Sequence, residues 1–314
     1  MQTTNHVLMV RPVRFAFNEE TAGSNAFQKR GDMDAEAQER LCRQAVSEFD
    51  AFVAMLRGNG ITVTVLQDTP VPFTPDSIFP NNCFSTHLDN GKRTLVLYPM
   101  LAPNRRLERT KLFPVFSVGE GSTFASQVHC ETIIDLTDHE EQGEFLEGTG
   151  SLILDREHRI AYACRSPRTN DTVVKEWASQ MGYDYFLFES EDKQGVPIYH
   201  TNVMMHIGTR FAIVCLKSIK NSSQREQLLH LLAMNGKEVV EISFEQMQAF
   251  AGNMLELRND NDEKLLVMSS TARNSLTPQQ VSILEKDVRI IAPDIPTIET
   301  AGGGSARCML AEIF

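Results

Sequence analysis

The C-terminal residues 302–314 contain the side chain best suited to covalent chemistry, Cys308. Three consecutive glycines, residues 302–304, precede it, and glycine lets the backbone approach a ligand closely. Arg307 stands directly before the cysteine, and a neighbouring cation stabilises the thiolate that acts as a nucleophile. A mostly apolar run follows and predicts a strand that begins at the cysteine. The same pattern also fits a flexible tail in which Cys308 is a small core residue.

A nucleophilic cysteine needs a proton carrier and groups that bind the substrate. Polar residues beside short strand-like openings elsewhere in the chain could serve, namely Asp76, Asn81, Asn82, Glu147, His200 and Asn202. His200 can carry protons, and Glu147 can accept hydrogen bonds from a substrate. Taken singly, His200 also fits a surface histidine, Glu147 an exposed acid at a turn, and Asp76 a turn cap.

Short segments with strand-like sequence recur along the chain, and each would be the first strand, or opening, of a module. These openings lie at residues 82–85, 150–153, 202–205, 253–256 and 307–310. After a longer first step they are about 50 residues apart, a period typical of repeated modules. Most openings lead to a second strand, a helix and a third strand, which predicts modules placed around an axis. An ordinary α/β sheet with accidental spacing is the alternative. If the modules share a centre, the polar residues converge with Cys308.

The N-terminal residues predict the rest of a fifth module. Residues 6–10 and 62–66 read as strands, and residues 35–57 form an amphipathic helix with apolar side chains at helical spacing. A long polar loop, residues 11–33, connects the first strand to this helix. The fifth opening, at Cys308, is not followed by a helix and two further strands. The N-terminal strand, helix and strand would supply the missing elements of that module. Residues 1–314 are therefore expected to form a single domain.

Composition excludes several classes of protein. The net charge of −11 argues against nucleic-acid or anionic-membrane partners. No apolar run is long enough to cross a bilayer, and the N-terminus has no signal-peptide pattern. Six scattered cysteines without zinc-ligand spacing indicate free thiols in a reducing cytoplasm. We expect no metal and no cofactor.

Several motifs resemble the amidinotransferase/deiminase superfamily, which includes arginine deiminase and dimethylargininase. Residues 74–82 (TPDSIFPNN) are similar to its P-D-x-V-F-x-[ED]-D segment, and residues 145–150 (FLEGTG) to its L-E-G-G-D turn. His200 stands where the family has its catalytic histidine, and residues 303–308 resemble the glycine-rich run that ends in the nucleophile. The resemblance implies a five-bladed α/β propeller (pentein fold) of ββαβ modules with pseudo-fivefold symmetry.

The resemblance also implies roles for individual residues. Cys308, His200 and Glu147 correspond to the catalytic set, and Asp76 to a substrate-binding acid. Residues 103–108 (PNRRLE) and 166–169 (SPRT) resemble segments whose arginines bind the substrate carboxylate. Those arginines are Arg105 and Arg168, although either could be a solvated surface charge. A guanidinium pairs strongly with a carboxylate.

Departures from the family pattern indicate the substrate. Arginine-processing relatives commonly have acids where this chain has Asn81 and Asn82, and arginine deiminases have an aspartate at the position of Asn202. A buried guanidinium calls for carboxylates, whereas an asparagine amide can both donate to and accept from a neutral ureido group. The chain therefore resembles the citrulline-hydrolysing branch, in which residues 11–28 are interpreted as a lid.

The expected reaction is hydrolysis of citrulline to ornithine, CO2 and ammonia through a covalent intermediate on Cys308. Arginine deiminase or dimethylarginine dimethylaminohydrolase activity is the alternative, and a non-catalytic ring-shaped binding protein is a third reading. A small ureido or guanidino amino acid is the expected partner, and a homodimer is left open.

Overall fold

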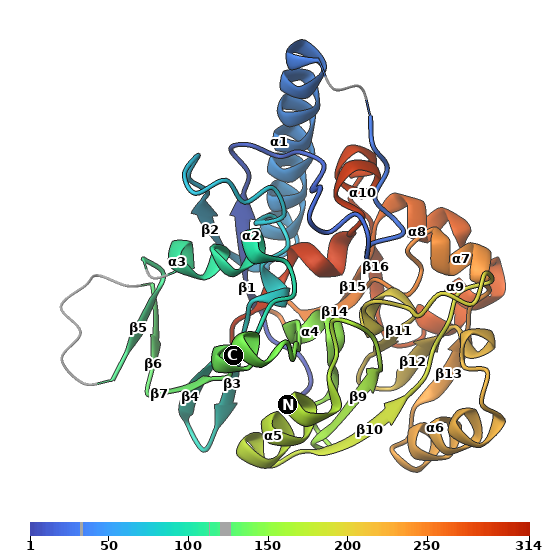
Figure 1. Ribbon diagram of the computed structural model, residues 1–314. Coiled ribbons are helices and arrows are strands. Elements are labelled where there is room, and N and C mark those ends of the chain that lie inside the picture. Colours follow the sequence, from blue (N-terminus) through green and yellow to red (C-terminus); the bar gives the residue numbers. More distant parts are fainter. Residues whose placement is uncertain (32–33, 113, 120–126) are drawn as a thin grey trace.

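The computed structural model describes residues 1–31, 34–112, 114–119 and 127–314, and shows a mixed α/β fold (Figure 1). Its described strands form five three-stranded sheets and one two-stranded sheet. The predicted loop 11–33 is described up to residue 31, so Met33 lies outside the described residues.

Four of the three-stranded sheets follow one another along the chain. They consist of β3 (Phe84–Asp89), β4 (Lys92–Leu97) and β7 (Thr132–Asp135); β8 (Ile153–Asp155), β9 (Ile160–Cys164) and β10 (Asp184–Phe188); β11 (Met205–Ile207), β12 (Phe211–Val214) and β13 (Glu238–Glu241); and β14 (Leu255–Arg258), β15 (Lys264–Val267) and β16 (Arg289–Ile291). In every sheet the first strand is antiparallel to the second and the second is parallel to the third. The strand order matches the predicted module.

Parallel neighbours require a crossover connection, and helices supply it. The crossovers contain α2 (Pro103–Arg106) and α3 (Glu108–Leu112), then α5 (Asp171–Met181), then α6 (Ser222–Met234), and finally α8 (Ser270–Ser275) and α9 (Pro278–Leu284). The first crossover is divided at Leu107 between the two short helices α2 and α3. α5 has Asn170 as its N-cap and Gly182 in the left-handed conformation at its end.

The fifth sheet joins the two ends of the chain, as the N-terminal elements predict. β17 (Ala311–Glu312) pairs antiparallel with β1 (His6–Arg11), and β1 pairs parallel with β2 (Thr62–Gln67). Helix α1 (Ala35–Gly58) connects β1 to β2, and Figure 1 shows it as the longest helix of the molecule. Asp34 caps its first turn, and Phe49, Phe52 and Leu56 are buried against the sheet side.

Short helical turns precede most of the opening strands, which corrects the predicted strand starts. These turns are η1 (Pro80–Asn82), α4 (Gly148–Ser151), η3 (Thr201–Val203) and η5 (Ala306–Met309). Small polar residues and glycine favour local hydrogen bonding over a strand ladder, which explains the turns at these positions. Cys308 accordingly lies in η5, where its N–H donates to the Ser305 carbonyl at 3.0 Å, and the strand begins only at Ala311.

The longer first step of the repeat contains additional structure between β4 and β7. A small parallel pair, β5 (Phe116–Val118) and β6 (Val128–Cys130), lies there, and β6 contacts β4. The remaining described elements are η2 (Thr137–Gln142), η4 (Leu216–Ser218), α7 (Phe244–Gln248) and α10 (Pro296–Gly302).

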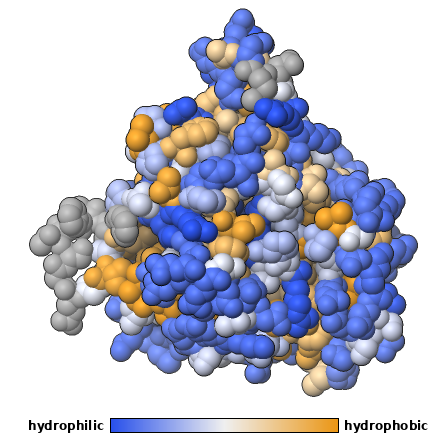
Figure 2. All heavy atoms as spheres, in the orientation of Figure 1, coloured by the Kyte–Doolittle hydropathy of each residue, from blue (hydrophilic) through white to orange (hydrophobic). Residues whose placement is uncertain are grey.

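Apolar side chains of the sheets and helices form the cores around the candidate site. Trp177 of α5, for example, is fully buried with Leu152, Ala161 and Ala163. Figure 2 shows a face dominated by hydrophilic residues, with apolar residues in small separate patches. Within the described residues, no helix has the length and apolar character needed to cross a membrane.

Candidate active site

Cys308 is buried, with about 5% of its surface exposed, and its sulfur contacts two side-chain amides. Asn253 Nδ2 lies 3.2 Å from Cys308 Sγ, and Asn202 Nδ2 lies 3.4 Å from it. Asn202 comes from η3 and Asn253 from the turn before β14, so elements far apart in the chain meet at the sulfur. The geometry presents amide N–H groups to a sulfur acceptor.

Asn253 was not among the predicted site residues. Its position carried a usable signal, because Asn82, Asn202 and Asn253 each stand at the first position of a repeated opening. Asn82 and Asn202 are predicted site residues, and the repeat alone predicts Asn253 as a third.

Arg307 does not act as the predicted cationic neighbour of the sulfur. Its guanidinium donates to the Leu310 carbonyl at 2.7 Å and to Glu312 Oε2 at 2.9 Å. Consecutive side chains in a tight helical turn point in different directions, which explains why Arg307 turns away while Cys308 faces the site.

His200 and Glu147 form a buried pair. His200 Nε2 lies 2.7 Å from Glu147 Oε2, and both side chains are almost completely buried. Burial lowers the pKa of His200 to about 4 despite the neighbouring carboxylate, so the ring is neutral near pH 7. Burial by itself would raise the pKa of Glu147, but Arg168, His200 and Arg105 hold it below its usual value. Because the ionised Glu147 can only accept, Nε2 is the ring donor and Nδ1 is the free acceptor.

Arg105 lines the site, but protein groups occupy most of its donors. Its Nε and Nη2 bond to the two carboxylate oxygens of Glu108 at 2.8 and 3.1 Å, and Nη2 also reaches the Phe79 carbonyl at 3.1 Å. Nη1 donates to Asn82 Oδ1 at 2.9 Å. Burial opposes the charge, yet Glu108 and Asp76 raise the pKa of Arg105 above its usual value. Little of this guanidinium is left for a substrate, and its predicted carboxylate-binding role stays a prediction.

Arg168 is held differently, because its partners come largely from the N-terminal segment. Ser24 Oγ lies 3.2 Å from Arg168 Nε and 2.6 Å from Nη2, and the Thr21 carbonyl is 3.4 Å from Nη2. Arg168 Nη1 reaches Glu147 Oε2 at 3.3 Å, and the guanidinium lies over the ring of Tyr199. A serine hydroxyl therefore occupies the edge of the guanidinium on which a carboxylate would bind.

The predicted acid and amides are buried, and they differ in what they face. Asp76 Oδ2 accepts from Asn18 Nδ2 at 2.8 Å and from Thr21 Oγ1 at 3.3 Å. Burial raises the pKa of Asp76 in spite of the attraction of Arg105. Asn81 bonds instead to Thr149 at 3.3 Å and helps to hold α4 against η1. Successive side chains of η1 diverge, so Asn82 lines the cavity whereas Asn81 does not.

Several polar atoms of this cluster have no hydrogen-bond partner within the described residues, namely Asp76 Oδ1, Asn81 Oδ1, Asn82 Nδ2 and Asn202 Oδ1. Leaving a buried polar atom unpaired costs roughly 1–3 kcal/mol, so such atoms point to an absent ligand or water. The orientation of Asn82 follows from its neighbour, because a guanidinium can only donate and Oδ1 must face Arg105. The free group of Asn82 is therefore a donor.

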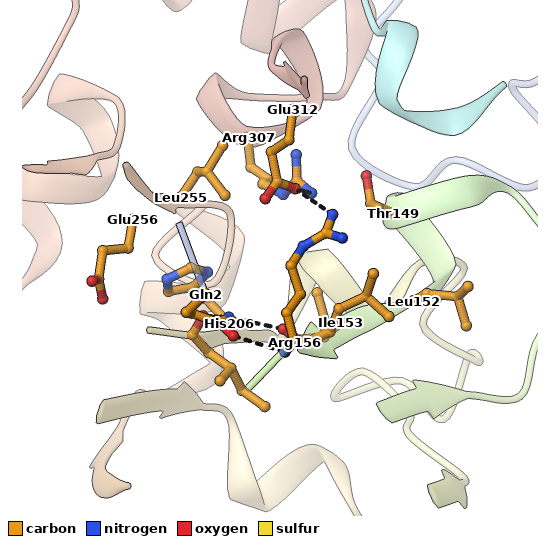
Figure 3. Close-up of a pocket in the computed structure, with 12 residues that line it drawn as sticks. Gln2, Thr149, Leu152, Ile153, Arg156, His206, Leu255, Glu256, Arg307 and Glu312 are labelled. Carbon is orange, nitrogen blue, oxygen red and sulfur yellow. Dashed lines mark hydrogen bonds and ion pairs between the residues drawn. The ribbon is translucent and has the colours of Figure 1, made fainter. Parts of the chain in front are cut away.

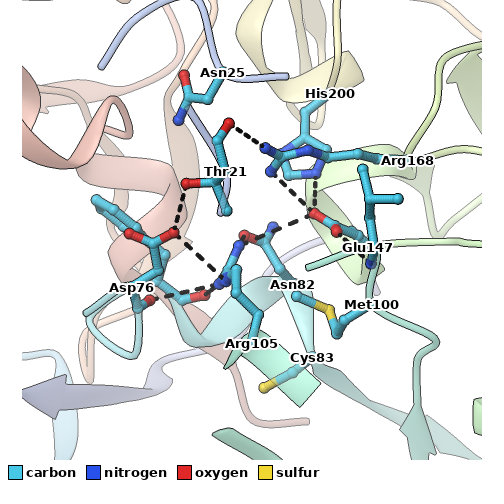
Figure 4. A network of polar contacts seen from close by, with 12 residues as sticks. Thr21, Asn25, Asp76, Asn82, Cys83, Met100, Arg105, Glu147, Arg168 and His200 are labelled. Atoms are coloured by element: carbon cyan, nitrogen blue, oxygen red, sulfur yellow. Dashed lines mark hydrogen bonds and ion pairs between the residues drawn. The ribbon is translucent and has the colours of Figure 1, made fainter. Parts of the chain in front are cut away.

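Figure 4 shows the polar network that joins Asp76, Arg105, Asn82, Glu147, Arg168 and His200. A small cavity at this cluster is lined by Asn25, Asp76, Phe79, Asn82, Arg105, Arg168, Tyr199, His200, Gly302, Gly303, Gly304 and Cys308. Its volume of about 20 Å³ is enough for one or two water molecules but not for an amino acid. Glycine at position 150 is needed beside it, because a Cβ there would lie 2.3 Å from Asn82 Nδ2 and 2.9 Å from His200 Nδ1.

Residues 18–28 close this cavity. Asn18, Thr21 and Ser24 bond to the site as described, and Asn25 Nδ2 reaches the Gly302 carbonyl at 3.3 Å. Lys29 N donates to the Thr300 carbonyl at 2.8 Å and continues the attachment along α10. The segment joins the molecule through these polar contacts and through Phe27, whose ring packs against Tyr199 and Phe250.

A second buried cavity of about 30 Å³ lies elsewhere in the fold (Figure 3). Arg307, Glu312, Arg156, His206 and Gln2 are among the residues that line it. Arg307 lines this second cavity and Cys308 the first, so neighbouring residues of η5 face different cavities.

Comparison with known proteins identifies the family of the chain. A profile of the family described as "N,N dimethylarginine dimethylhydrolase, eukaryotic" matches residues 11–314. No curated protein sequence matches the chain.

Several solved structures share the fold. The N-terminal domain of ArgZ, an arginine dihydrolase of the ornithine-ammonia cycle in cyanobacteria, superposes with a TM-score of 0.70 at 15% identity, covering 97% of this chain and 96% of that domain. AgrE in complex with L-arginine gives 0.72 at 16% identity, covering 98% of this chain and 40% of AgrE. The chain likewise spans 40% of full-length ArgZ. DDAH from Pseudomonas aeruginosa, complexed with citrulline, gives 0.64 at 12% identity over 100% of both chains.

Proposed function

The chain belongs to the N,N-dimethylarginine dimethylhydrolase family, and from this premise we propose that it is a cysteine-dependent hydrolase of citrulline or a closely related ureido amino acid. The products are ornithine, CO2 and ammonia. The whole chain acts as one domain, a five-bladed α/β propeller. Five sheets with the same strand directions, and the meeting of the chain ends in one of them, support this architecture.

The observation that supports a ureido substrate is the set of unpaired polar atoms at the cavity. A ureido group has one carbonyl oxygen that accepts and N–H groups that donate. The oriented Asn82 Nδ2 supplies a donor for the oxygen, and Asp76 Oδ1 and Asn202 Oδ1 supply acceptors for the N–H groups. A guanidinium has no acceptor and would leave Asn82 Nδ2 unpaired.

The reaction begins with Cys308 and His200. Sγ attacks the ureido carbon while the free Nδ1 of His200 accepts the thiol proton. His200 then delivers that proton to the δ-nitrogen, the C–N bond breaks and ornithine leaves, so that a carbamoyl-thioester remains on Cys308. Glu147, which bonds to Nε2 at 2.7 Å, stabilises the imidazolium while it holds the proton.

Water completes the cycle at the same atoms. His200 takes a proton from a water molecule, the hydroxide attacks the thioester carbon and the C–S bond breaks. The proton returns to Cys308 Sγ, and carbamic acid is released and decays to CO2 and ammonia. The N–H groups of Asn82 and neighbouring amides stabilise the negative oxygen in both steps.

The α-carboxylate of the substrate binds Arg168 after residues 18–28 open. Ser24 Oγ and the Thr21 carbonyl occupy this guanidinium in the closed state and leave together with the segment. The partners of Arg105 do not lie on that segment, so Arg105 keeps Glu108 and serves chiefly to orient Asn82. Because the closed cavity holds only about 20 Å³, this opening must precede binding.

A guanidino substrate is the second candidate, and a charge count favours it. Among the described residues, the carboxylates of Glu108, Asp76 and Glu147 form ion pairs with two cations, Arg105 and Arg168. Burial raises the pKa of Asp76 and raises that of Glu108 to about 7, and a cationic arginine or methylarginine would favour the ionised forms, whereas neutral citrulline would not.

A substrate comparison decides between the two candidates. Purified protein is incubated with citrulline, L-arginine and NG,NG-dimethylarginine, and ornithine, citrulline, dimethylamine and ammonia are measured. The proposal predicts ornithine and ammonia from citrulline at the highest kcat/KM. Faster release of citrulline from arginine or dimethylarginine would replace it with the second candidate.

A further inference from the structure

We propose that Asn253 is a further catalytic residue of this site, whose side-chain amide donates a hydrogen bond to Cys308 Sγ and stabilises the thiolate. The inference rests on the proposed role of Cys308 as the nucleophile. Asn253 Nδ2 lies 3.2 Å from the sulfur, within the range of an N–H···S hydrogen bond, and only about 1% of the residue is exposed.

The orientation of the Asn253 amide is determined by two backbone groups. The Arg307 N–H, which can only donate, lies 3.1 Å from Asn253 Oδ1. The Asn202 carbonyl, which can only accept, lies 3.2 Å from Asn253 Nδ2. Nδ2 must therefore be the group that faces Cys308, and the sulfur must accept from it. Asn202 lacks such a constraint, because its Oδ1 has no partner within the described residues.

The sulfur needs this donor because cations near it are committed elsewhere. The Arg307 guanidinium bonds to Leu310 and Glu312, and His200 is neutral at pH 7 because burial lowers its pKa to about 4. A preformed thiolate–imidazolium pair is thus disfavoured, and negative charge develops on Sγ as its proton leaves. Hydrogen bonds to the charged form favour that form.

Other charged or titratable groups share the cavity and contribute to the same equilibrium. They come from several elements and are Asp76, Arg105, Arg168, Tyr199 and His200. Glu147 stands behind His200, and Arg307 adjoins Cys308. All of these side chains are retained when only Asn253 is replaced, so a variant at Asn253 removes the amide from an otherwise unchanged set of titratable groups.

The experiment must distinguish the proposed stabilisation of the thiolate from a purely structural role of Asn253. Through its three contacts the side chain connects η3, η5 and the start of β14, and its loss could simply loosen Cys308. Loosening would lower activity and stability without moving the pH at which Cys308 becomes reactive. A lost N–H donor would move that pH upward.

The experiment measures alkylation of Cys308 by iodoacetamide without substrate. The rate is followed by mass spectrometry of the Cys308 peptide from pH 5 to 10, in wild type, Asn253→Ala and Asn253→Asp. Asn259→Ala is the matched control, since Asn259 is a buried asparagine of the same module that bonds to Glu263 instead. Unfolding of each variant is measured in parallel.

We expect the midpoint of the pH–rate curve to rise by about one unit in Asn253→Ala. The rate near pH 7 would then fall about tenfold, while the high-pH plateau stays unchanged. Asn253→Asp should move the midpoint further, because its carboxylate keeps the acceptor for Arg307 N–H but repels the thiolate. Asn259→Ala should match wild type.

Two results would overturn the inference. Midpoints of Asn253→Ala and Asn253→Asp that coincide with wild type would assign Asn253 a structural role only. If Asn253→Ala does not fold, a wild-type midpoint in the isosteric Asn253→Asp has the same meaning. Full turnover by Cys308→Ala would refute the proposed mechanism instead, whereas the alkylation curves need no substrate and report on the amide separately.

Discussion

The two buried cavities contain similar residue types and differ in how those residues are satisfied. In the second cavity, Gln2 uses both sides of its amide: Nε2 donates to the Leu154 and Ile207 carbonyls at 2.9 and 3.3 Å, and Oε1 accepts from Arg156 N at 2.8 Å. In the cavity at Cys308, the corresponding amide of Asn82 has an oriented but unused donor. The amide of Gln2 is therefore fully used within the protein, whereas the Nδ2 donor of Asn82 has no partner among the described residues.

Unpaired atoms alone do not separate the cavities. Arg156 Nη2 and His206 Nε2 at the second cavity are also without a hydrogen-bond partner among the described residues. The cavity at Cys308 differs in having a thiol, a histidine paired with a carboxylate, and a covering segment that contacts it through hydroxyls and amides. A buried arginine–glutamate pair, such as Arg307–Glu312, is compatible with a structural role.

The largest expected effect is that of Cys308→Ala. Turnover should fall by about four orders of magnitude or more, because no other group at the cavity can form the thioester. The fold should persist, since only one small side chain is truncated. Activity and thermal unfolding are measured together, and a carbamoyl adduct on Cys308 is sought by mass spectrometry in quenched wild-type reactions. Residual activity near the wild-type level would remove the difference between the two cavities.

Arg168→Ala should have the next largest effect, on KM more than on kcat. Loss of a buried carboxylate partner costs about 2 kcal/mol or more, which is roughly 30-fold in binding. Ser24→Ala is the matched control, because it removes the hydroxyl that occupies Arg168 in the closed state and should leave KM unchanged or lower. An N-alkylurea without the α-carboxylate should not distinguish Arg168→Ala from wild type. Equal losses on both compounds would contradict the assignment.

How much of this site was predictable depends on what holds each residue. The strand order, the crossover helices and the convergence of Glu147, His200 and Cys308 follow from local patterns and the repeat. The direction of Arg307 does not, because it depends on the Leu310 carbonyl and Glu312, which the fold brings to it. The occupation of Arg168 by Ser24 is also a tertiary contact, 144 residues apart in sequence.

Asn82→Asp should change substrate preference by a smaller amount. The new carboxylate has no donor for a ureido oxygen, so citrulline turnover should fall, and arginine should bind better. A charge-assisted hydrogen bond to the guanidinium contributes roughly 1.5–3 kcal/mol before desolvation. Competition by arginine against citrulline hydrolysis is measured in both proteins. Asn81→Asp is the control, because Asn81 faces Thr149 and not the cavity. Unchanged arginine inhibition in Asn82→Asp would show that Asn82 does not select a neutral substrate.

The smallest expected effect on activity is that of His206→Gln in the second cavity. Burial, together with Arg307 and Lys237, lowers the pKa of His206 to about 3. A histidine whose pKa is lowered by folding contributes stability that is fully present above its unfolded pKa, about 6.5, and is lost as the pH falls toward 3. Between pH 6 and 4.5, the free energy of unfolding of His206→Gln should therefore decline less steeply than that of wild type, by up to about 1.4 kcal/mol per pH unit. Chemical denaturation across this pH range measures the slopes, and kcat/KM at pH 7 should stay within about twofold of wild type.

His200→Gln should reduce the slope similarly, since burial also lowers the pKa of His200, but it should abolish turnover. Loss of activity in both variants would mean that the second cavity takes part in catalysis, and the distinction between the two cavities would fail.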